Sequence, residues 1–225
     1  MPLAIEVEAL PHIDVALVSH NHYDHLDEWT VARLARQAGG APRYMVPLRL
    51  AAWFTRRGLD TVTELDWWQS YASNGLRLTF TPVQHWSARS AWDRDRTLWG
   101  GWRLDHRDFS FFFAGDSGYS PDFKDMYTRL GPVDLAALPI GAYAPRWFMQ
   151  VMHADPDDAV QMHLDLHARH SVAMHWGTFV LTDEPLDEPP QRLRRALTNA
   201  NLTEQDFWVL RHGETRSLPL HVAVA

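Results

Sequence analysis

One nine-residue stretch, SHNHYDHLD at residues 19–27, limits what this chain can be more than any other feature. It follows PHIDVALV, in which Ile13, Val15 and Leu17 alternate with other residues as in a half-buried strand. Four side chains able to bind metal fall within its residues 20–25, namely His20, His22, Asp24 and His25. As mere core, these groups would be buried without partners, which is costly. The stretch therefore predicts a site at the end of a strand.

Three more metal-binding side chains follow apolar strands later in the chain. His85 follows LRLTFTPVQ, Asp116 follows FFFAG, and His175 ends SVAM. Rigid strands hold side chains at their ends while the loops stay open to a substrate, so we expect these residues to gather there. His20 and His22 are two positions apart in an extended segment and can share one ion. Asp24 and His25 point elsewhere, which indicates a second ion.

Composition restricts the metal and the partners. The chain has no cysteine, so His, Asp and Glu must bind any metal, which favours zinc, manganese or iron. A formal net charge of −7 argues against a nucleic-acid partner. No apolar run approaches the roughly 20 residues that a membrane span needs, and the N-terminus lacks a signal-peptide pattern. We therefore expect a cytoplasmic protein.

The hydrophobic pattern predicts one α/β domain over residues 1–225, with sheets covered by helices. Helices are expected at 28–38, 48–58, 121–131, 155–170 and 188–202. Strands are expected at 13–18, 43–47, 61–67, 76–86, 133–143 and 171–176, with a hairpin over 97–117 and a last strand or hairpin over 206–218. Asp27 and Asp155 are the expected helix caps.

The order of motifs resembles a known superfamily. His-x-His-x-Asp-His after an apolar strand is similar to the signature of the metallo-β-lactamase fold superfamily of two-metal hydrolases. VQHWSARS, LWGGW, FAGDSGY, PIGAY, MHADPDDAV and MHWGTF resemble the N-acylphosphatidylethanolamine-hydrolysing phospholipase D family. The resemblance implies an αββα sandwich. It also implies a zinc-dependent phosphodiesterase that cleaves N-acylphosphatidylethanolamine-type phospholipids by attack of a hydroxide bridging two zinc ions.

The resemblance also implies a role for each residue of the motifs. One zinc ion would be bound by His20, His22 and His85, the other by Asp24, His25 and His175, and both by Asp116. His153 matches a family histidine that lies near the metals without binding them, so it is a second catalytic candidate beside Asp116. A histidine that helps to cap the following helix is an equally good interpretation of His153.

Other residues are weaker candidates. Tyr23, inside the first motif, and Trp86 are expected to contact the substrate. Arg89, Arg94 and Arg96 could meet a phosphate headgroup, although exposed loop arginines usually have no such role. His163 and His167 are four residues apart, and the simplest interpretation places them on one polar helix face.

The chain departs from its relatives at the N-terminus. Those relatives carry several strands before the first histidine motif, whereas here only 19 residues precede His20. We therefore expect part of the first sheet to be missing and an edge that could pair with a second copy as a homodimer. A lipid substrate would add peripheral membrane contact. The alternatives are a hydrolase of a lactone, thioester or phosphorylated small molecule, and an inactive metal-binding module.

Overall fold

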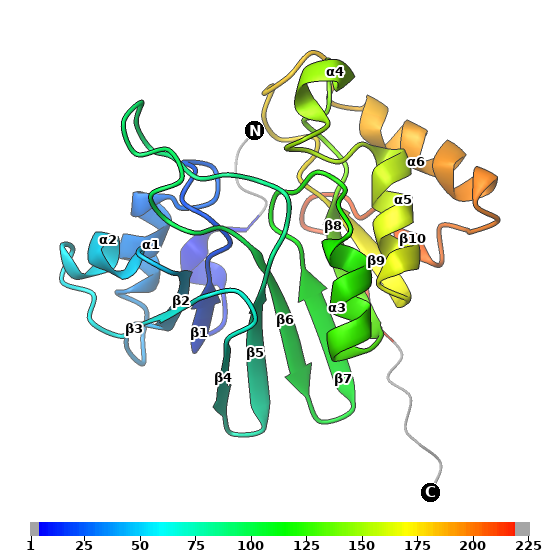
Figure 1. Ribbon diagram of the computed structural model, residues 1–225. Helices are drawn as coiled ribbons and strands as arrows, with labels where there is room; N and C mark the ends of the chain where they lie inside the picture. Colours follow the sequence, from blue (N-terminus) through cyan, green and yellow to red (C-terminus); the bar gives the residue numbers. More distant parts are fainter. Residues whose placement is uncertain (1–4, 219–225) are drawn as a thin grey trace, which may run out of the picture.

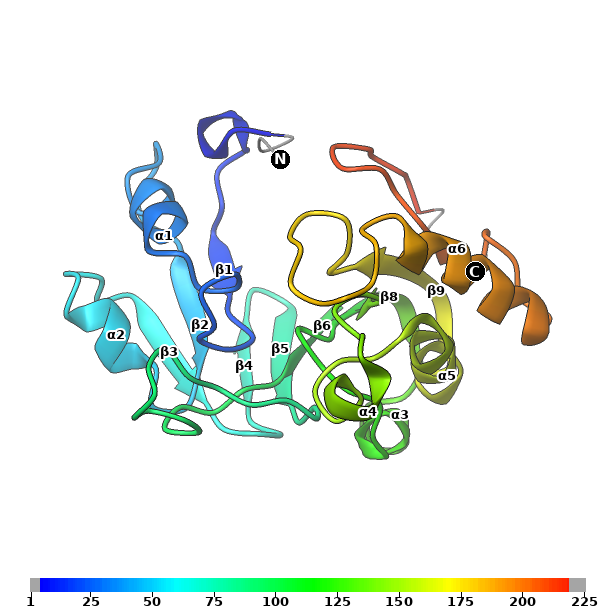
Figure 2. The same ribbon diagram turned by 90° about the horizontal axis from the view of Figure 1, so that it is seen from above.

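The fold is a four-layer sandwich in which two sheets face one another and helices cover their outer surfaces (Figure 1; Figure 2). The computed structural model describes residues 5–218. Outside the smaller sheet lie α1 (Glu28–Leu34) and α2 (Ala51–Thr55). Outside the larger sheet lie α3 (Asp122–Leu130), α5 (Pro156–Asp165) and α6 (Glu188–Asn199). The arrangement confirms the predicted αββα sandwich of the α/β class.

The smaller sheet is parallel and has the order β1-β2-β3. Its strands are β1 (Val15–Leu17), β2 (Arg43–Pro47) and β3 (Val62–Leu65). A short 3-10 helix, η1 (Val7–Ala9), precedes β1. Among residues 5–218, β1 pairs only with β2, so the other side of β1 is an open edge. Pairing of this edge with a second copy stays a prediction.

The larger sheet has seven strands in the order β10-β9-β8-β7-β6-β5-β4. They are β4 (Ser70–Ser73), β5 (Leu76–Thr81), β6 (Gly101–His106), β7 (Phe109–Phe113), β8 (Val133–Pro139), β9 (Ala168–Met174) and β10 (Phe207–Trp208). The half from β4 to β7 is antiparallel, and the half from β7 to β10 is parallel. Within the described residues, no helix is long and apolar enough to cross a membrane.

The two sheets are joined by a core that also positions the first histidine motif. Met45 of the smaller sheet packs with Phe80 and Trp102 of the larger one, and all three are fully buried. The indole N–H of Trp102 donates a hydrogen bond of 2.9 Å to the carbonyl of Val18, the last residue before SHNHYDHLD. A buried indole donor needs such a partner, so packing between the sheets fixes the point where the motif leaves β1.

Several predicted boundaries are wrong in ways that local sequence does not reveal. The predicted helix 155–170 ends at Asp165, because His167 adopts a left-handed φ of 47° and the chain then enters β9. Helix α1 ends at Leu34 rather than near residue 38, and the predicted strand 206–218 is regular only at β10. Two elements, β4 and the single turn α4 (Arg146–Met149), were not predicted from the sequence. Both caps are confirmed, since Asp27 and Asp155 accept hydrogen bonds from the first turns of α1 and α5.

Candidate metal centre

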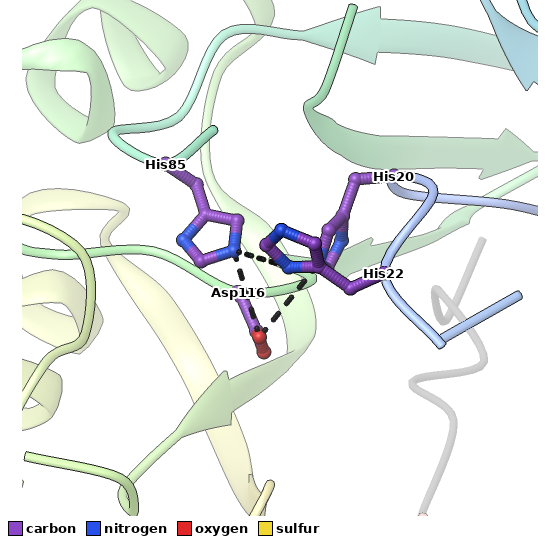
Figure 3. A group of neighbouring side chains, drawn as sticks. All are labelled: His20, His22, His85 and Asp116. Carbon is purple, nitrogen blue, oxygen red and sulfur yellow. Dashed lines mark hydrogen bonds and ion pairs between the residues drawn. The ribbon is translucent and has the colours of Figure 1, made fainter. Parts of the chain in front are cut away.

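Four strand ends bring seven metal-binding side chains together. The first motif follows β1, His85 follows β5, Asp116 follows β7, and His175 follows β9. The side chains form two groups that share Asp116. One group is His20, His22, His85 and Asp116, drawn in Figure 3, and the other is Asp24, His25, Asp116 and His175. The predicted ligand set is therefore assembled as two adjoining sites.

In the first group, the imidazole nitrogens converge on one point (Figure 3). His20 Nε2 lies 2.9 Å from His22 Nδ1, and His85 Nε2 lies 3.3 Å from the same atom. Asp116 Oδ2 is 3.8 Å from His20 Nε2 and 3.7 Å from His85 Nε2. Ligands around a tetrahedral zinc ion stand about 3.3 Å apart. The spacing of these four side chains therefore fits such an ion.

The second group has the same spacing and contains a second carboxylate. His25 Nε2 is 3.1 Å from Asp116 Oδ2 and 3.4 Å from Asp24 Oδ2. His175 Nε2 is 3.2 Å from Asp116 Oδ1 and 3.6 Å from Asp24 Oδ2. Each oxygen of Asp116 therefore faces the second group, while Oδ2 also faces the first. A carboxylate placed in this way can bridge two ions.

Two glycines let these loops approach closely enough to form the groups. Gly115 has a φ of +64°, and a Cβ there would lie 2.6 Å from the Cβ of Ser19. A Cβ on Gly141 would lie 2.3 Å from the carbonyl oxygen of His175. Neither approach is possible for a residue with a side chain. Gly115 therefore lets Asp116 reach the first motif, and Gly141 lets the chain after β8 pass beside His175.

Burial keeps the histidines of the first group uncharged. Burial lowers the pKa of His20 well below its ordinary value, although the negative charge of Asp116 opposes the shift. In the same way, burial against the opposing charge of Asp116 lowers the pKa of His85 to about 3. Neutral imidazole is the form that binds metal. These histidines are therefore ready as ligands at neutral pH without losing a proton.

The second group is electrostatically different. Burial would lower the pKa of His25, but the negative charges of Asp116 and Asp24 close to its ring raise it to about 10. Burial likewise opposes the charge of Asp116, yet His175 and His25 hold its pKa well below its usual range. A metal ion entering the second group must therefore displace a proton from His25.

Several buried polar atoms in the centre have no hydrogen-bond partner. These atoms are His22 Nε2, His25 Nε2, Asp116 Oδ1, His153 Nδ1 and His175 Nδ1. His25 Nε2 and Asp116 Oδ1 lie close to opposite charges but are not aligned as hydrogen bonds. An unpaired buried polar atom costs about 1–3 kcal/mol, so a protein rarely keeps several without a use. Two of these atoms, His25 Nε2 and Asp116 Oδ1, are among those that converge within the groups, and together with the spacing of both groups they fit a pair of metal ions.

Neighbouring groups fix the orientation of two ligand rings. His85 Nδ1 lies 2.9 Å from the carbonyl of Met152, so its N–H is donated there and Nε2 is left as the ligand. His20 Nδ1 lies 3.0 Å from the hydroxyl of Ser19. Such partners hold the tautomer and ring direction of metal-binding histidines. Neither Ser19 nor Met152 could be identified as a partner from the sequence, because no motif marks a single hydroxyl or a backbone carbonyl for this role.

His153 lies against both groups without belonging to either. Its ring centroid is 5.1 Å from that of His85, edge to face, and 5.5 Å from that of His175, stacked. Burial lowers the pKa of His153 to about 4, while the charge of Asp116 opposes that shift. Its backbone carbonyl accepts a hydrogen bond of 2.8 Å from Arg146. Helix α5 is capped by Asp155, so the capping interpretation does not account for the placement of the His153 ring.

The two predicted substrate residues differ in how they lie relative to the ligand groups. The Trp86 ring packs edge to face on His22 at 4.4 Å between centroids. Tyr23 is exposed, and its hydroxyl donates to the carbonyl of Arg89. Nη1 of Arg89 donates to the carbonyls of Asn21 and Leu26. Arg89 therefore braces the first motif, and a role for it in binding a phosphate headgroup stays a prediction.

The histidines on α5 are also placed differently from the prediction. His163 is buried rather than on a polar face, and its Nδ1 lies 2.8 Å from the hydroxyl of Ser171 on β9. His167 lies beyond the end of the helix and stacks on Tyr127. The two side chains therefore do not form a metal-binding pair.

An apolar cavity opens beside the second group. Its volume is about 380 Å³, and Asp24, His25 and His175 form part of its wall. The rest of the wall is mainly apolar and includes Met174, Trp176, Phe179, Leu181, Leu186 and Leu210. The MHWGTF motif forms part of this wall, but the cavity could not be predicted from the sequence, because the fold is needed to bring that motif beside residues 181–189. A molecule bound there would contact the second group directly.

Comparisons with known proteins agree with this geometry. The family described as the beta-lactamase superfamily domain matches residues 1–176. The chain therefore belongs to this superfamily. Its fold is shared with solved metallo hydrolases, and its two ligand groups could hold metal ions.

Several individual proteins are similar to this chain. The chain is 39% identical over 225 residues to N-acyl-phosphatidylethanolamine-hydrolyzing phospholipase D 1 of Caenorhabditis elegans, covering 95% of this chain and 63% of that protein. It is 37% identical over 196 residues to the mitochondrial N-acyl-phosphatidylethanolamine-hydrolyzing phospholipase D of Saccharomyces cerevisiae, covering 84% and 41%. The chain thus spans about half the length of these curated relatives. Igni18, a metallo hydrolase from the archaeon Ignicoccus hospitalis, has the same fold, with a TM-score of 0.74 at 20% identity over 93% of this chain and 81% of that one.

Proposed function

We propose that the chain binds two zinc ions and hydrolyses a phosphodiester bond of N-acylphosphatidylethanolamine-type phospholipids. The observation that carries the proposal is that Asp116 faces both ligand groups, so that it could bridge two metal ions. The nitrogen and carboxylate donors suit zinc. The substrate class is supported by the two similar phospholipases and by the apolar cavity that begins at the second group.

The side chains of the centre would have separate roles in metal binding and in substrate binding. His20, His22, His85 and Asp116 would hold one ion, and Asp24, His25, Asp116 and His175 the other. Bound there, the two ions would lower the pKa of a water molecule and offset charge on the phosphate oxygens. His153, whose buried Nδ1 lacks a partner, would donate a hydrogen bond to a phosphate oxygen. The apolar cavity would take an acyl chain of the substrate and exclude water beside the second group.

The decisive experiment uses phosphorus NMR. Zinc-loaded protein is incubated with mixed micelles of N-acylated phosphatidylethanolamine, with and without a chelator. Hydrolysis of the bond between phosphorus and the N-acylethanolamine oxygen releases phosphatidic acid. We therefore expect a phosphatidic-acid signal that grows with time and disappears when the chelator is present.

Each failure of this experiment has its own meaning. A silent spectrum from folded protein that holds two zinc ions would reject the phosphodiesterase proposal and direct attention to lactones and thioesters. Turnover that persists in chelator would reject the metal centre as its cause. Bound zinc without turnover of any ester would indicate a metal-binding module without activity.

We further propose that the protein works at a lipid surface. Large apolar side chains are exposed on three segments: α4 and the turn after it, the loop after β9 and the loop after β5. They are Trp147, Phe148 and Val151, then Phe179, Val180 and Leu181, and also Trp92. In Figure 1, α4 and the loop after β5 stand at the same end of the molecule as the ends of the strands that carry ligands. Such a concentration of exposed apolar side chains marks an interaction surface.

Vesicle sedimentation tests the lipid contact. The double substitution Trp147→Ser with Phe148→Ser should reduce co-sedimentation with phospholipid vesicles by roughly tenfold or more, because it removes two apolar anchors. Hydrolysis of a soluble phosphodiester, bis(4-nitrophenyl) phosphate, should not change. Trp29→Ser on α1, which removes an exposed ring outside the smaller sheet, is the matched control and should sediment like the wild type. Equal sedimentation of the double variant and the wild type would count against this surface.

A further inference from the structure

The segment that closes the apolar cavity is held by one carboxylate. This segment, residues 176–186, contains no helix or strand and supplies much of the cavity wall. Its Glu184 accepts hydrogen bonds from three consecutive backbone N–H groups, at 2.6 Å from Ala142, 3.2 Å from Tyr143 and 2.9 Å from Ala144. The hydroxyl of Thr182 donates a further bond of 2.7 Å to the same carboxylate. Both oxygens of Glu184 are therefore bound.

The backbone that receives Glu184 is shaped to bind an anion. Ala142 has a positive φ of 64°, and it follows Gly141, which passes close to His175. Successive N–H groups that point the same way form a concave binding place for a negative charge. Here the negative charge comes from the chain itself. Hydrogen bonds to an ionised acceptor are roughly twice as strong as hydrogen bonds between neutral groups. The contact of Glu184 with residues 142–144 therefore holds the 176–186 segment in place.

Other contacts of the segment are few. The N–H of Asp183 donates to the carbonyl of Ala144 at 3.3 Å, and the hydroxyl of Thr178 lies 3.1 Å from His212 Nε2. Between these points the side chains of Phe179 and Leu181 line the cavity while remaining largely exposed to solvent. Their position therefore depends on the attachment at Glu184 more than on burial in a core.

We infer that Glu184 is a positioning residue that fixes the 176–186 segment as the wall of an apolar subsite beside Asp24, His25 and His175, and so determines which apolar chain of a substrate is accepted. The inference rests on the proposed function for the identity of the substrate. The subsite itself rests on the cavity and on the hydrogen bonds of Glu184. Glu184 acts through the wall and does not touch the reacting atoms.

The kinetic test compares substrates that differ only in the length of one acyl chain. Each methylene that enters the cavity should lower KM of the wild type by about fourfold until the cavity is full. In Glu184→Ala this dependence on chain length should largely disappear, while kcat for the shortest substrate and the zinc content stay as in the wild type. Glu184→Gln keeps one acceptor oxygen but turns an amide group toward the Ala144 N–H, so it should fall between the two.

The matched control is Asp183→Asn. It makes the same change of charge one residue away. Asp183 contacts Ala144 through its backbone N–H, so its side chain is not needed for that contact. Its dependence on chain length should equal that of the wild type. If Glu184→Ala lost activity equally on short and long substrates, or kept the wild-type dependence, Glu184 would not set the subsite.

A binding experiment separates this inference from the proposed activity. The fluorescence of cis-parinaric acid, an unsaturated fatty acid, is titrated with the metal-loaded protein and then displaced by saturated fatty acids of increasing length. The wild type should bind the probe and prefer longer chains, and Glu184→Ala should bind more weakly with little preference. This result would support the subsite even if no phosphodiester were cleaved. Equal binding by the wild type and Glu184→Ala would overturn the inference.

Discussion

Replacing Asp116 by asparagine is expected to remove at least one zinc equivalent and to abolish turnover. Asp116 faces both groups, with Oδ2 3.1 Å from His25 Nε2 and Oδ1 3.2 Å from His175 Nε2. The amide would keep the shape of the side chain but lose the negative charge at the centre of five histidines that are buried or half-buried. Even partners outside the ligand shell cost 10–100-fold in metal affinity, so the loss here should exceed about 100-fold. Metal analysis of dialysed protein measures the occupancy, and initial rates measure the turnover.

The control for this substitution is Asp108→Asn in the turn between β6 and β7. It makes the same chemical change at an exposed position away from the centre and should leave zinc content and rate unchanged. Two zinc equivalents in Asp116→Asn, together with normal turnover, would show that Asp116 does not bridge the sites. One retained zinc would be expected in the first group, whose three histidines are buried or half-buried and uncharged without Asp116.

The ligand set could be predicted from the sequence because each member has a local signal. His85, Asp116 and His175 each end an apolar strand, and the hydrophobic period identifies such strands without knowledge of the fold. The sheet then brings the strand ends to one edge. The resemblance to a two-metal family added the division into two groups, which spacing alone left open beyond the first motif. The observed groups agree with that division.

The features that could not be predicted depend on contacts between distant residues. Arg89 looks like an exposed loop arginine, yet it donates to the carbonyl of Asn21, 68 positions away. The end of α5 is set by the left-handed turn at His167, although the sequence pattern continues as a helix. Glu184 stands in an irregular segment, and only the fold brings the N–H groups of residues 142–144 to it. Hydrogen bonds to backbone atoms leave no pattern in a single sequence.

Replacing His153 by alanine is expected to lower kcat by about 100- to 1,000-fold, the range found when one donor to a developing negative charge is removed. The zinc content should stay at the wild-type value, because the His153 ring packs on His85 and His175 without joining either ligand group. Initial rates on micellar substrate, together with metal analysis, measure both quantities. His106→Gln, at the end of β6, is a control that should change neither.

The pH profile decides how His153 acts. Burial lowers the pKa of His153 to about 4, so the ring is neutral throughout the range from about pH 5.5 to 8. A neutral donor does not gain or lose a proton in that range. The plots of log kcat against pH for the wild type and His153→Gln should therefore be parallel, with the same difference in log kcat at every pH. If His153 instead served as a general acid or base near neutrality, the wild-type profile would contain a limb that the variant lacks. An unchanged kcat in both variants would leave His153 as a packing residue between two ligand histidines, with no part in the reaction.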